Sequence, residues 1–350
     1  MKKKRNELID IFKGVAIILV VIGHCIQYGS GYNFKNELLF FNNFIFKFIY
    51  SFHMPFFMLI SGYLFYNSDL KKTVFEVIIS KIKQILIPII SFSTIIFIID
   101  LCLENVVYNR IINFVISYIK YCFNNLWFLW SILFLTIGFK VLNTILNKLK
   151  FKDWLKNITY CLIWLLLLII PDVFGIQMHK FMYPYFIIGY MFNKYKYEFN
   201  IKNSIELIIL VVIYILLYSQ FSYDTYIYNS GYAIWNRSIL QMLYIDIHRF
   251  LIGLVGSILC IKIISWIYKN IKTKKIYFIL SNLGKKSLGI YAISNIIFTY
   301  ALFNITFELL TINYGFVLFE SIVILLVSYV ISYLFSKNKV LNLLFLGNRS

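Results

Sequence analysis

Charged side chains are scarce in this chain of 350 residues. They make up 14% of the sequence, whereas hydrophobic residues make up 61% and aromatic residues 20%, and the mean hydropathy is +0.78. A water-soluble protein of this size needs more polar surface than this composition provides. A soluble globular class is therefore excluded, and the sequence predicts an all-α, polytopic integral membrane protein.

Acidic residues are few as well, with 15 Asp and Glu against 34 Lys and Arg, so the formal net charge is +19. In a soluble chain an excess of this size would suggest a nucleic acid as partner. Here the basic residues lie between apolar runs, where they report the orientation of membrane helices. We therefore exclude nucleic acid as a partner and expect the lipid bilayer instead.

The five cysteines are odd in number and include no CxxC pair. This pattern indicates neither a disulfide framework nor a zinc site, and no metal ion is predicted. Cys102 and Cys122 flank one loop and are the two that could pair. The chain also lacks a small-residue cleavage site after its first apolar run, so this run is predicted to be a retained helix.

Apolar runs of membrane length predict about ten transmembrane helices, because a hydrocarbon core of about 30 Å requires about 20 apolar residues per helix. No tandem repeat, Pro- or Ser-rich linker or low-complexity tail is present, so we predict a single domain over residues 1–350. The expected spans lie near residues 11–28, 48–66, 82–103, 126–146, 158–174, 181–192, 205–221, 250–268, 276–303 and 316–335.

The lysines and arginines decide the orientation of these spans. With ten spans, 27 of the 34 basic residues fall at the N-terminus, the C-terminus and the loops on their side, and seven fall in the alternate loops. Basic residues concentrate on the cytoplasmic side of membrane proteins. We therefore expect a multi-pass protein of the bacterial inner, cytoplasmic membrane with both termini in the cytoplasm.

The first predicted helix carries ionisable residues within its apolar run, and such residues usually line a cavity or a pathway. Lys13 and His24 are eleven residues apart, which places them on one helix face with a rise of about 16 Å between them. Asp10 lies one turn before Lys13 and can pair with it. A cation is thus expected at the cytoplasmic mouth and a histidine deep in the outer half.

The second predicted helix runs in the opposite direction and begins with another histidine. His53 enters at about the depth of His24, so the two side chains are expected at matching levels in adjacent helices. Pro55 leaves a backbone carbonyl one turn earlier without its amide partner, while Ser61 and Gly62 allow close helix approach. A polar notch beside the first helix is therefore plausible.

Five segments together resemble the membrane acyltransferase-3 family, especially its fucose 4-O-acetylase-like branch. The resemblance spans nearly the whole chain, in order, and its pieces lie in the first, second, fourth, sixth and ninth predicted helices. They read DIFKGVAIILVVIGH, HMPFFMLISGYLF, NNLWFLWSILF, YPYFIIGYMF and LGKKSLGIYAIS.

The resemblance implies an acyl-CoA-dependent O-acyltransferase, most commonly an O-acetyltransferase. Such an enzyme uses cytoplasmic acetyl-CoA and a carbohydrate acceptor, which is a surface polysaccharide, an oligosaccharide or a lipid-linked sugar. In the family an arginine precedes the catalytic histidine with ten residues between them, and Lys13 and His24 match that spacing with lysine. Lys81 and Lys83 match basic residues that lead the third helix, so all three lysines are expected to bind the donor. Ser294 stands where the family often has histidine.

Several alternatives remain at this point. His24 either acts as a general base or carries the acyl group itself. His53 either joins His24 and Asp10 in the catalytic site or only satisfies the backbone that Pro55 loosens. The whole chain could instead be a transporter or flippase of a lipid-linked saccharide or a small solute, with His24 and Lys13 as a proton relay. Transporters often have inverted repeats, and no convincing internal symmetry is present.

Overall fold

The computed structural model describes residues 6–29, 41–104, 111–170, 176–199, 204–227, 238–271, 273–302 and 314–347. Within these ranges the secondary structure is helical, without strands. The elements in chain order are α1 (Glu7–Gly29), α3 (Phe44–Lys71), α4 (Val74–Lys81), the π-helical η2 (Ile82–Leu86), α5 (Ile87–Glu104), α6 (Ile111–Asn124), α7 (Trp127–Lys148), α8 (Asp153–Ile169), α9 (Ile176–Lys194), α10 (Ser204–Ser219), the 3-10 turn η3 (Tyr223–Thr225), α12 (Ile239–Asn270), α13 (Lys274–Lys285), α14 (Ser287–Ile297), the π-helical η4 (Phe298–Leu302), α15 (Tyr314–Lys337), α16 (Lys339–Leu341) and the π-helical η5 (Asn342–Leu346).

Six of the described helical stretches are long and apolar enough to cross a membrane, namely α1, α3, the continuous stretch through α4, η2 and α5, α7, α12 and α15. The all-α, polytopic membrane class predicted from composition is thereby confirmed. The other expected spans coincide with α8, α9, α10 and α14. Three of these are 17 residues or shorter, and α9 is longer but contains Lys180 and Lys194. The count of ten spans and the cytoplasmic position of the termini stay predictions.

The ninth expected span was wrong as a single helix over residues 276–303. The chain forms α13 and α14 instead, with a break at Lys286, whose φ and ψ are −102° and 8°. Helix α13 packs along α1, and a Cβ added to Gly14 would lie 2.0 Å from the carbonyl oxygen of Leu280. Only a glycine permits this contact between the two backbones.

Helix α6 lies in a segment for which the sequence predicted no helix. At 14 residues it is too short to span a membrane, and most of its side chains are exposed. It packs against α5, where the hydroxyls of Thr94 and Tyr118 are 2.7 Å apart. The two cysteines on these elements, Cys102 and Cys122, are free. No disulfide therefore links the ends of the intervening loop.

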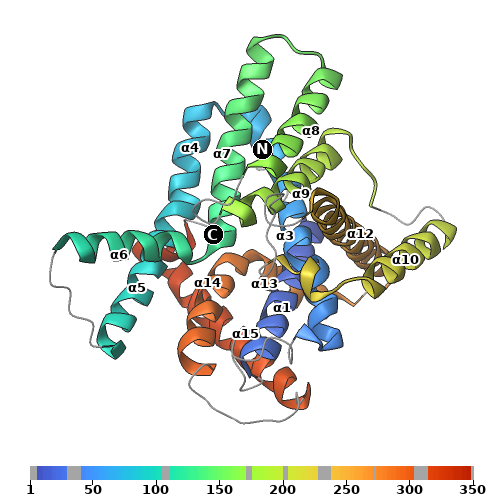
Figure 1. Cartoon of the computed structure of the whole chain (residues 1–350). Helices are drawn as coiled ribbons and strands as arrows, with labels where there is room; N and C mark the ends of the chain where they lie inside the picture. The colour runs from blue at the N-terminus through green and yellow to red at the C-terminus, as the bar shows by residue number, and fades with distance from the viewer. Residues whose placement is uncertain are drawn as a thin grey trace.

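The central helices of the fold are α1 and α3. Figure 1 shows α7, α8 and α9 on one side of this pair and α13, α14 and α15 on the other. Several helices end on one face, at Glu7, Lys71, Lys148, Lys194 and Asn270. Contacts near these ends include the hydrogen bond of 2.9 Å from the Tyr268 hydroxyl to Glu7 and the ion pair of 3.0 Å between Lys194 and Asp153. We call this side the basic face.

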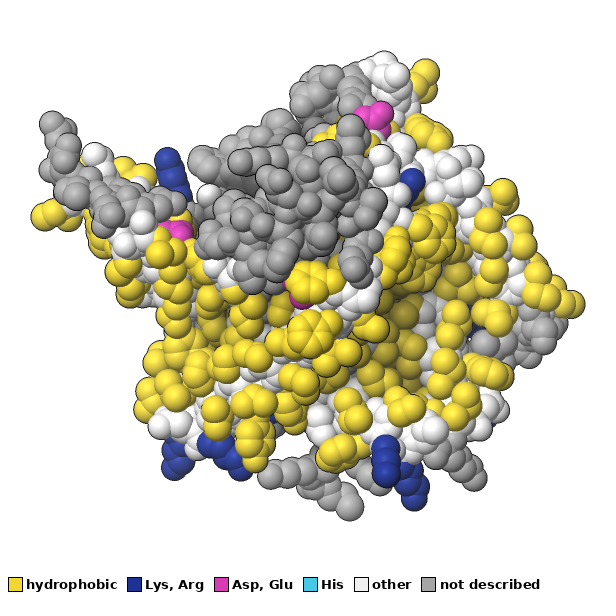
Figure 2. All heavy atoms as spheres, turned by 90° about the horizontal axis from the view of Figure 1, so that it is seen from below, with side chains coloured by type: hydrophobic (Ala, Val, Ile, Leu, Met, Phe, Trp, Pro, Cys, Tyr) yellow, Lys and Arg dark blue, Asp and Glu magenta, His cyan; other side chains and the backbone are white. Residues whose placement is uncertain are grey.

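The surface of the protein has the distribution expected for a bilayer. Figure 2 shows a broad belt of hydrophobic side chains across the middle of one side of the molecule, with Lys and Arg side chains mostly along one edge. Exposed apolar residues on α10, α12 and α15 include Ile208, Ile247 and Leu326. Such a continuous apolar surface is unfavourable in water and favourable against lipid tails.

Close packing of α3 against α9 depends on Gly62. A Cβ added at Gly62 would lie 2.0 Å from the carbonyl oxygen of Phe186, as the sequence anticipated for this position. We expect Gly62→Ala to destabilise the protein by about 1–3 kcal/mol, because the backbones must separate to admit the methyl group. Thermal unfolding of the purified protein in detergent measures this. Gly138→Ala is the matched control, since a Cβ there meets no atom within 4 Å. An unchanged Gly62→Ala variant would contradict the packing argument.

Candidate active site

A cavity of about 340 Å³ lies between α1, α3, α4, η2, α7 and α14. We call it the first cavity. Polar side chains line its part near the basic face, and mostly apolar side chains line its deeper part. The polar group includes Lys13, Ser68, Lys72, Ser80, Lys81 and Gln84, and the deeper group includes Val20, Met54, Phe57, Phe128 and Tyr291. The cavity can therefore take a molecule with an anionic head and a less polar arm.

Lys13 and Asp10 form the ion pair that their spacing predicts. Lys13 Nζ lies 2.8 Å from Asp10 Oδ1, and the two side chains are 18% and 4% exposed. Lys13 lines the first cavity, whereas Asp10 is buried beside it. The structure thus brings Asp10 to Lys13 and not to His24, which lies fourteen residues further along the same helix, a rise of about 21 Å. From this position Asp10 orients the lysine.

The two lysines predicted at the start of the third span point in different directions. Lys81 lines the first cavity, and its Nζ is 5.8 Å from the ring centroid of Phe65. Lys83 is exposed and is not among the residues that line the cavity. Residues two apart on a helix face nearly opposite directions, which accounts for this difference. Lys72, which the sequence analysis did not single out, also lines the cavity and donates to Ser80 Oγ at 3.0 Å.

His24 is held on one side of its ring by polar groups of α1 and α3. Its Nδ1 lies 3.3 Å from Gln27 Oε1 and 3.3 Å from the hydroxyl of Tyr50. The Tyr50 hydroxyl also donates to Gln27 Oε1 at 3.0 Å. Because the amide oxygen of Gln27 only accepts hydrogen bonds, this network assigns the ring proton of a neutral His24 to Nδ1. The lone pair is then on Nε2, the nitrogen suited to accept a proton.

His53 lies near His24, and Tyr50 contacts both rings. The centroid of the Tyr50 ring is 6.2 Å from that of His24 and 4.6 Å from that of His53. His53 is 3% exposed, and its Nδ1 donates to the carbonyl oxygen of Ile49 at 2.9 Å. This bond goes to the carbonyl one turn before His53, whereas the carbonyl that Pro55 leaves without an amide partner is that of Ser51. The structure therefore places the two histidines in one cluster through a shared tyrosine.

An aromatic wall closes another side of His24. The ring of Phe298, the first residue of η4, has its centroid 5.0 Å from that of His24. Phe298 also stacks on Tyr28, with centroids 5.8 Å apart and an interplanar angle of 8°. Ser294, one turn earlier in α14, is buried and donates to the carbonyl of Tyr291.

The first cavity approaches His24 along α1. Val20 lines the cavity and lies one helical turn, about 6 Å, before His24. Lys13 lines one end of this cavity, and His24 lies one turn beyond Val20 on the same helix, outside the residues that line the cavity. This arrangement can bind an anion at one end and remove a proton at the other.

Comparison with known proteins identifies the class to which this arrangement belongs. A family model described as an acyltransferase domain matches residues 6–337, nearly the whole chain. The chain belongs to this acyltransferase family. The resemblance stated from the five sequence segments is thereby confirmed. No solved structure matches the chain.

Two curated relatives of the acyltransferase carry the same name, nodulation protein NolL. The relative from Mesorhizobium japonicum is 24% identical over 309 residues, which cover 84% of this chain and 77% of the relative. The relative from Sinorhizobium fredii is 29% identical over 192 residues, which cover 54% of this chain and 49% of the relative. The similarity to the second thus spans about half of each protein.

Tyr50, Gln27 and Lys72 of the acyltransferase were missed by the sequence analysis. Gln27 lies three residues after His24, so the i,i+3 spacing within one helix was a signal that could have identified it. Tyr50 reaches His24 from another helix, and its distance in sequence gives no such signal. The described part of the chain contains no group of three or more His, Cys, Asp or Glu side chains placed to hold a metal ion.

Removing the Tyr50 hydroxyl should slow acyl transfer without weakening donor binding. We expect Tyr50→Phe to lower kcat about five- to tenfold, the equivalent of one hydrogen bond of about 1 kcal/mol, with an unchanged KM for the donor. Stacking on Phe46, at 3.9 Å between centroids, would be retained. Tyr214→Phe is the control. The Tyr214 hydroxyl lies 2.8 Å from the hydroxyl of Ser51, which is on α3 but does not contact His24. Equal kcat values in wild type and Tyr50→Phe would contradict an orienting role.

Proposed function

We propose that this acyltransferase is an O-acetyltransferase that uses cytoplasmic acetyl-CoA and acylates a hydroxyl of an extracytoplasmic or lipid-linked carbohydrate. It acts in the bacterial inner membrane, with its basic face in the cytoplasm. One observation carries the proposal: the first cavity begins at Lys13 and Lys81 and reaches Val20, one helical turn from His24. A donor with phosphates at one end and a thioester at the other fits this arrangement.

The cations at the polar end of the first cavity bind the phosphates of the donor. Lys13, Lys72 and Lys81 all line this end, and lysine binds phosphate as a point charge. The pantetheine arm then follows α1 towards His24. The rise of about 16 Å from Lys13 to His24 is comparable to the reach of that arm. Lys83 lies outside this cavity, so its contribution is a longer-range charge at the basic face.

His24 removes the proton of the acceptor hydroxyl through Nε2. The hydroxyl oxygen forms a bond to the thioester carbonyl carbon, and the bond between that carbon and sulfur breaks. The departing thiolate takes the proton from the imidazolium, which returns His24 to its neutral form. Gln27 and Tyr50 hold Nδ1 and so fix the ring and its tautomer. His53 positions Tyr50 by packing against it.

In the alternative route, Nε2 of His24 first accepts the acyl group and then passes it to the hydroxyl. Both routes use the same nitrogen and the same donor cavity. They differ in whether acyl-CoA is consumed before the carbohydrate arrives. Release of free CoA thiol by the purified protein without any acceptor, in an amount equal to the enzyme, would favour the acyl-histidine route.

Oriented proteoliposomes test the proposed function. When the basic face is outward, external acetyl-CoA labelled in the acetyl group should lose its thioester and label a carbohydrate enclosed in the vesicle. Vesicles of the opposite orientation should not use external acetyl-CoA. Movement of a saccharide across the membrane without release of CoA thiol would contradict the proposal and support the transporter alternative.

A further inference from the structure

A second cavity, of about 480 Å³, lies on the basic face between α3, α7, α8 and α9. Its charged lining residues are five lysines and two aspartates, an excess of three positive charges. They are Lys71, Lys72, Lys140, Lys156, Lys194, Asp69 and Asp153. Of its lining residues the proposed reaction uses only Lys72, and the size of the cavity lies within the usual range for small-molecule sites.

The inner part of the second cavity is a buried polar network that joins four helices, α3, α7, α8 and α9. Asp69 Oδ2 accepts hydrogen bonds of 2.8 Å from both Asn143 Nδ2 and the Tyr190 hydroxyl. Lys140 Nζ lies 2.9 Å from Asp69 Oδ1, and Tyr160 donates to Asn143 Oδ1. All five residues are less than 10% exposed. This network fixes the cavity wall, so the lining does not have to reorganise when a ligand binds.

The outer rim of the second cavity has two lysines around one aspartate. Lys194 Nζ lies 3.0 Å and Lys156 Nζ 3.7 Å from Asp153 Oδ1. The hydrogen bond from Lys194 lowers the pKa of Asp153, so this carboxyl stays ionised at neutral pH. The aspartate is 62% exposed, whereas each lysine side chain is 16% exposed. An anion with two or more negative charges can compete with this exposed carboxylate for both ammonium groups.

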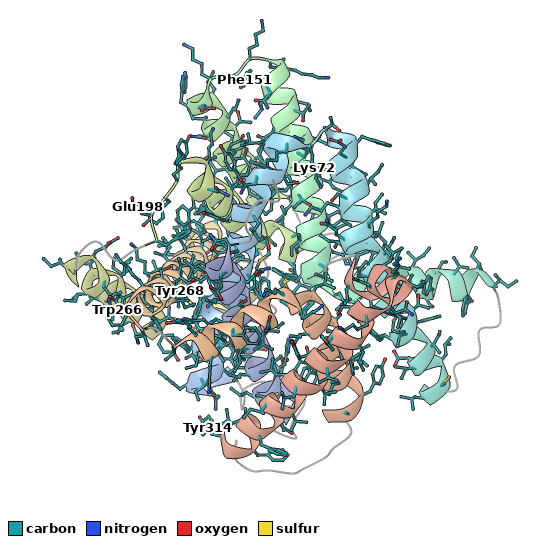
Figure 3. All side chains as sticks on the ribbon, turned by 180° about the vertical axis from the view of Figure 1, so that it is seen from behind. Lys72, Phe151, Glu198, Trp266, Tyr268 and Tyr314 are labelled. Atoms are coloured by element: carbon teal, nitrogen blue, oxygen red, sulfur yellow. The ribbon has the colours of Figure 1, made fainter. Side chains whose placement is uncertain are left out.

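Lys72 connects the two cavities because it lines both. Figure 3 places Lys72 where α3 passes into α4, beside α7. The two cavities therefore adjoin at this lysine. An extended donor with several phosphate charges at one end is of the class that could reach from the first cavity into the second.

We propose that the second cavity is a phosphate-binding site that receives the phosphorylated nucleotide end of the acyl donor. The nucleotide identity rests on the proposed function, since it assumes a CoA thioester as donor. Phosphate binding itself rests only on the lysines and the buried network. A phospholipid headgroup offers the same chemistry at a membrane surface, and the experiment below separates these two sources.

Binding of adenosine 3′,5′-bisphosphate tests the site without any acyl transfer, because this probe lacks both the pantetheine arm and the thioester. Titration calorimetry uses the full-length protein in nanodiscs of phosphatidylcholine, which has no net charge. We expect Lys156→Gln/Lys194→Gln to weaken binding at least tenfold and Asp153→Asn to strengthen it several-fold, since that change removes the competing carboxylate. Lys148→Gln is the matched control, because Lys148 is exposed on α7 and does not line the cavity.

The outcomes distinguish the sources of the phosphate. Nucleotide binding that changes in opposite directions in the two variants supports the proposal, even if the protein transfers no acetyl group and the proposed function fails. If Lys156→Gln/Lys194→Gln and Asp153→Asn bind the nucleotide with the same affinity as Lys148→Gln, the nucleotide assignment is overturned. In that case, variant-dependent binding of phosphatidylglycerol supports a lipid phosphate as the ligand. Equal binding of both probes by all variants overturns the phosphate site altogether.

Discussion

The His24→Ala variant is expected to insert and fold normally and to transfer no acyl group. Loss of a general base costs on the order of 10²–10⁴-fold in rate, and loss of an acyl carrier removes the step entirely. Folding should survive because His24 is only partly buried and its ring contacts are with neighbouring polar and aromatic side chains. Transfer of labelled acetyl groups by purified protein in proteoliposomes measures the effect.

Two other histidines serve as comparisons for the His24→Ala variant. His179, whose Nδ1 lies 2.7 Å from the hydroxyl of Ser131, is also partly buried but lies between α7 and α9, away from the cavity. His179→Ala should therefore retain activity. His53→Ala should reduce kcat less than His24→Ala does if it only positions Tyr50, and equally if it takes part in the chemistry. Wild-type transfer by His24→Ala would eliminate the mechanism.

The Lys13→Gln variant is expected to raise the KM for acetyl-CoA about tenfold or more, with a smaller change in kcat. A charged hydrogen bond contributes about 1.5–3 kcal/mol, and glutamine removes the cation while leaving His24 in place. Lys13→Arg should retain or improve donor binding, because arginine keeps the charge and adds a planar fork suited to phosphate. Initial rates at a series of acetyl-CoA concentrations measure both effects.

The ion pair with Asp10 requires a control in this series. Glutamine at position 13 removes the cation that lies 2.8 Å from the buried Asp10 carboxylate, which also lowers stability. Asp10→Asn/Lys13→Gln removes both charges, and it should restore the stability while the KM stays high. An inactive but folded Lys13→Arg variant would instead favour a proton relay, because arginine does not release its proton in proteins.

The sequence predicted correctly the parts that depend on one helix or on one residue. The pairing of Asp10 with Lys13 follows from 3.6 residues per turn, and the close approach at Gly62 follows from its missing side chain. The contact between Tyr50 and His24 depends on how α1 and α3 cross, which periodicity along one helix does not determine. The same limit explains why Lys72 was missed.

Errors along the chain have local physical causes. Residues 276–303 were predicted to be one span because the apolar run outweighed the two lysines at 285 and 286, whereas the structure interrupts the helix there. Helix α6 was not predicted because, at 14 residues, it is shorter than the apolar runs that span a membrane. Composition predicted the membrane class correctly because every surface that faces lipid must be apolar, which raises the hydrophobic content of the whole chain.

The π-helical turn η4 has an evolutionary consequence. A turn of this kind holds one residue more than an α-helical turn, and each added or removed residue rotates the following side chains by about 100°. A relative that lacks the extra residue would keep the ring at position 298 and would rotate the side chains that come after it. We therefore expect alignments of this family to require a single-residue gap near residues 298–302, and relatives on either side of that gap to differ in the side chains just after the aromatic ring beside the histidine.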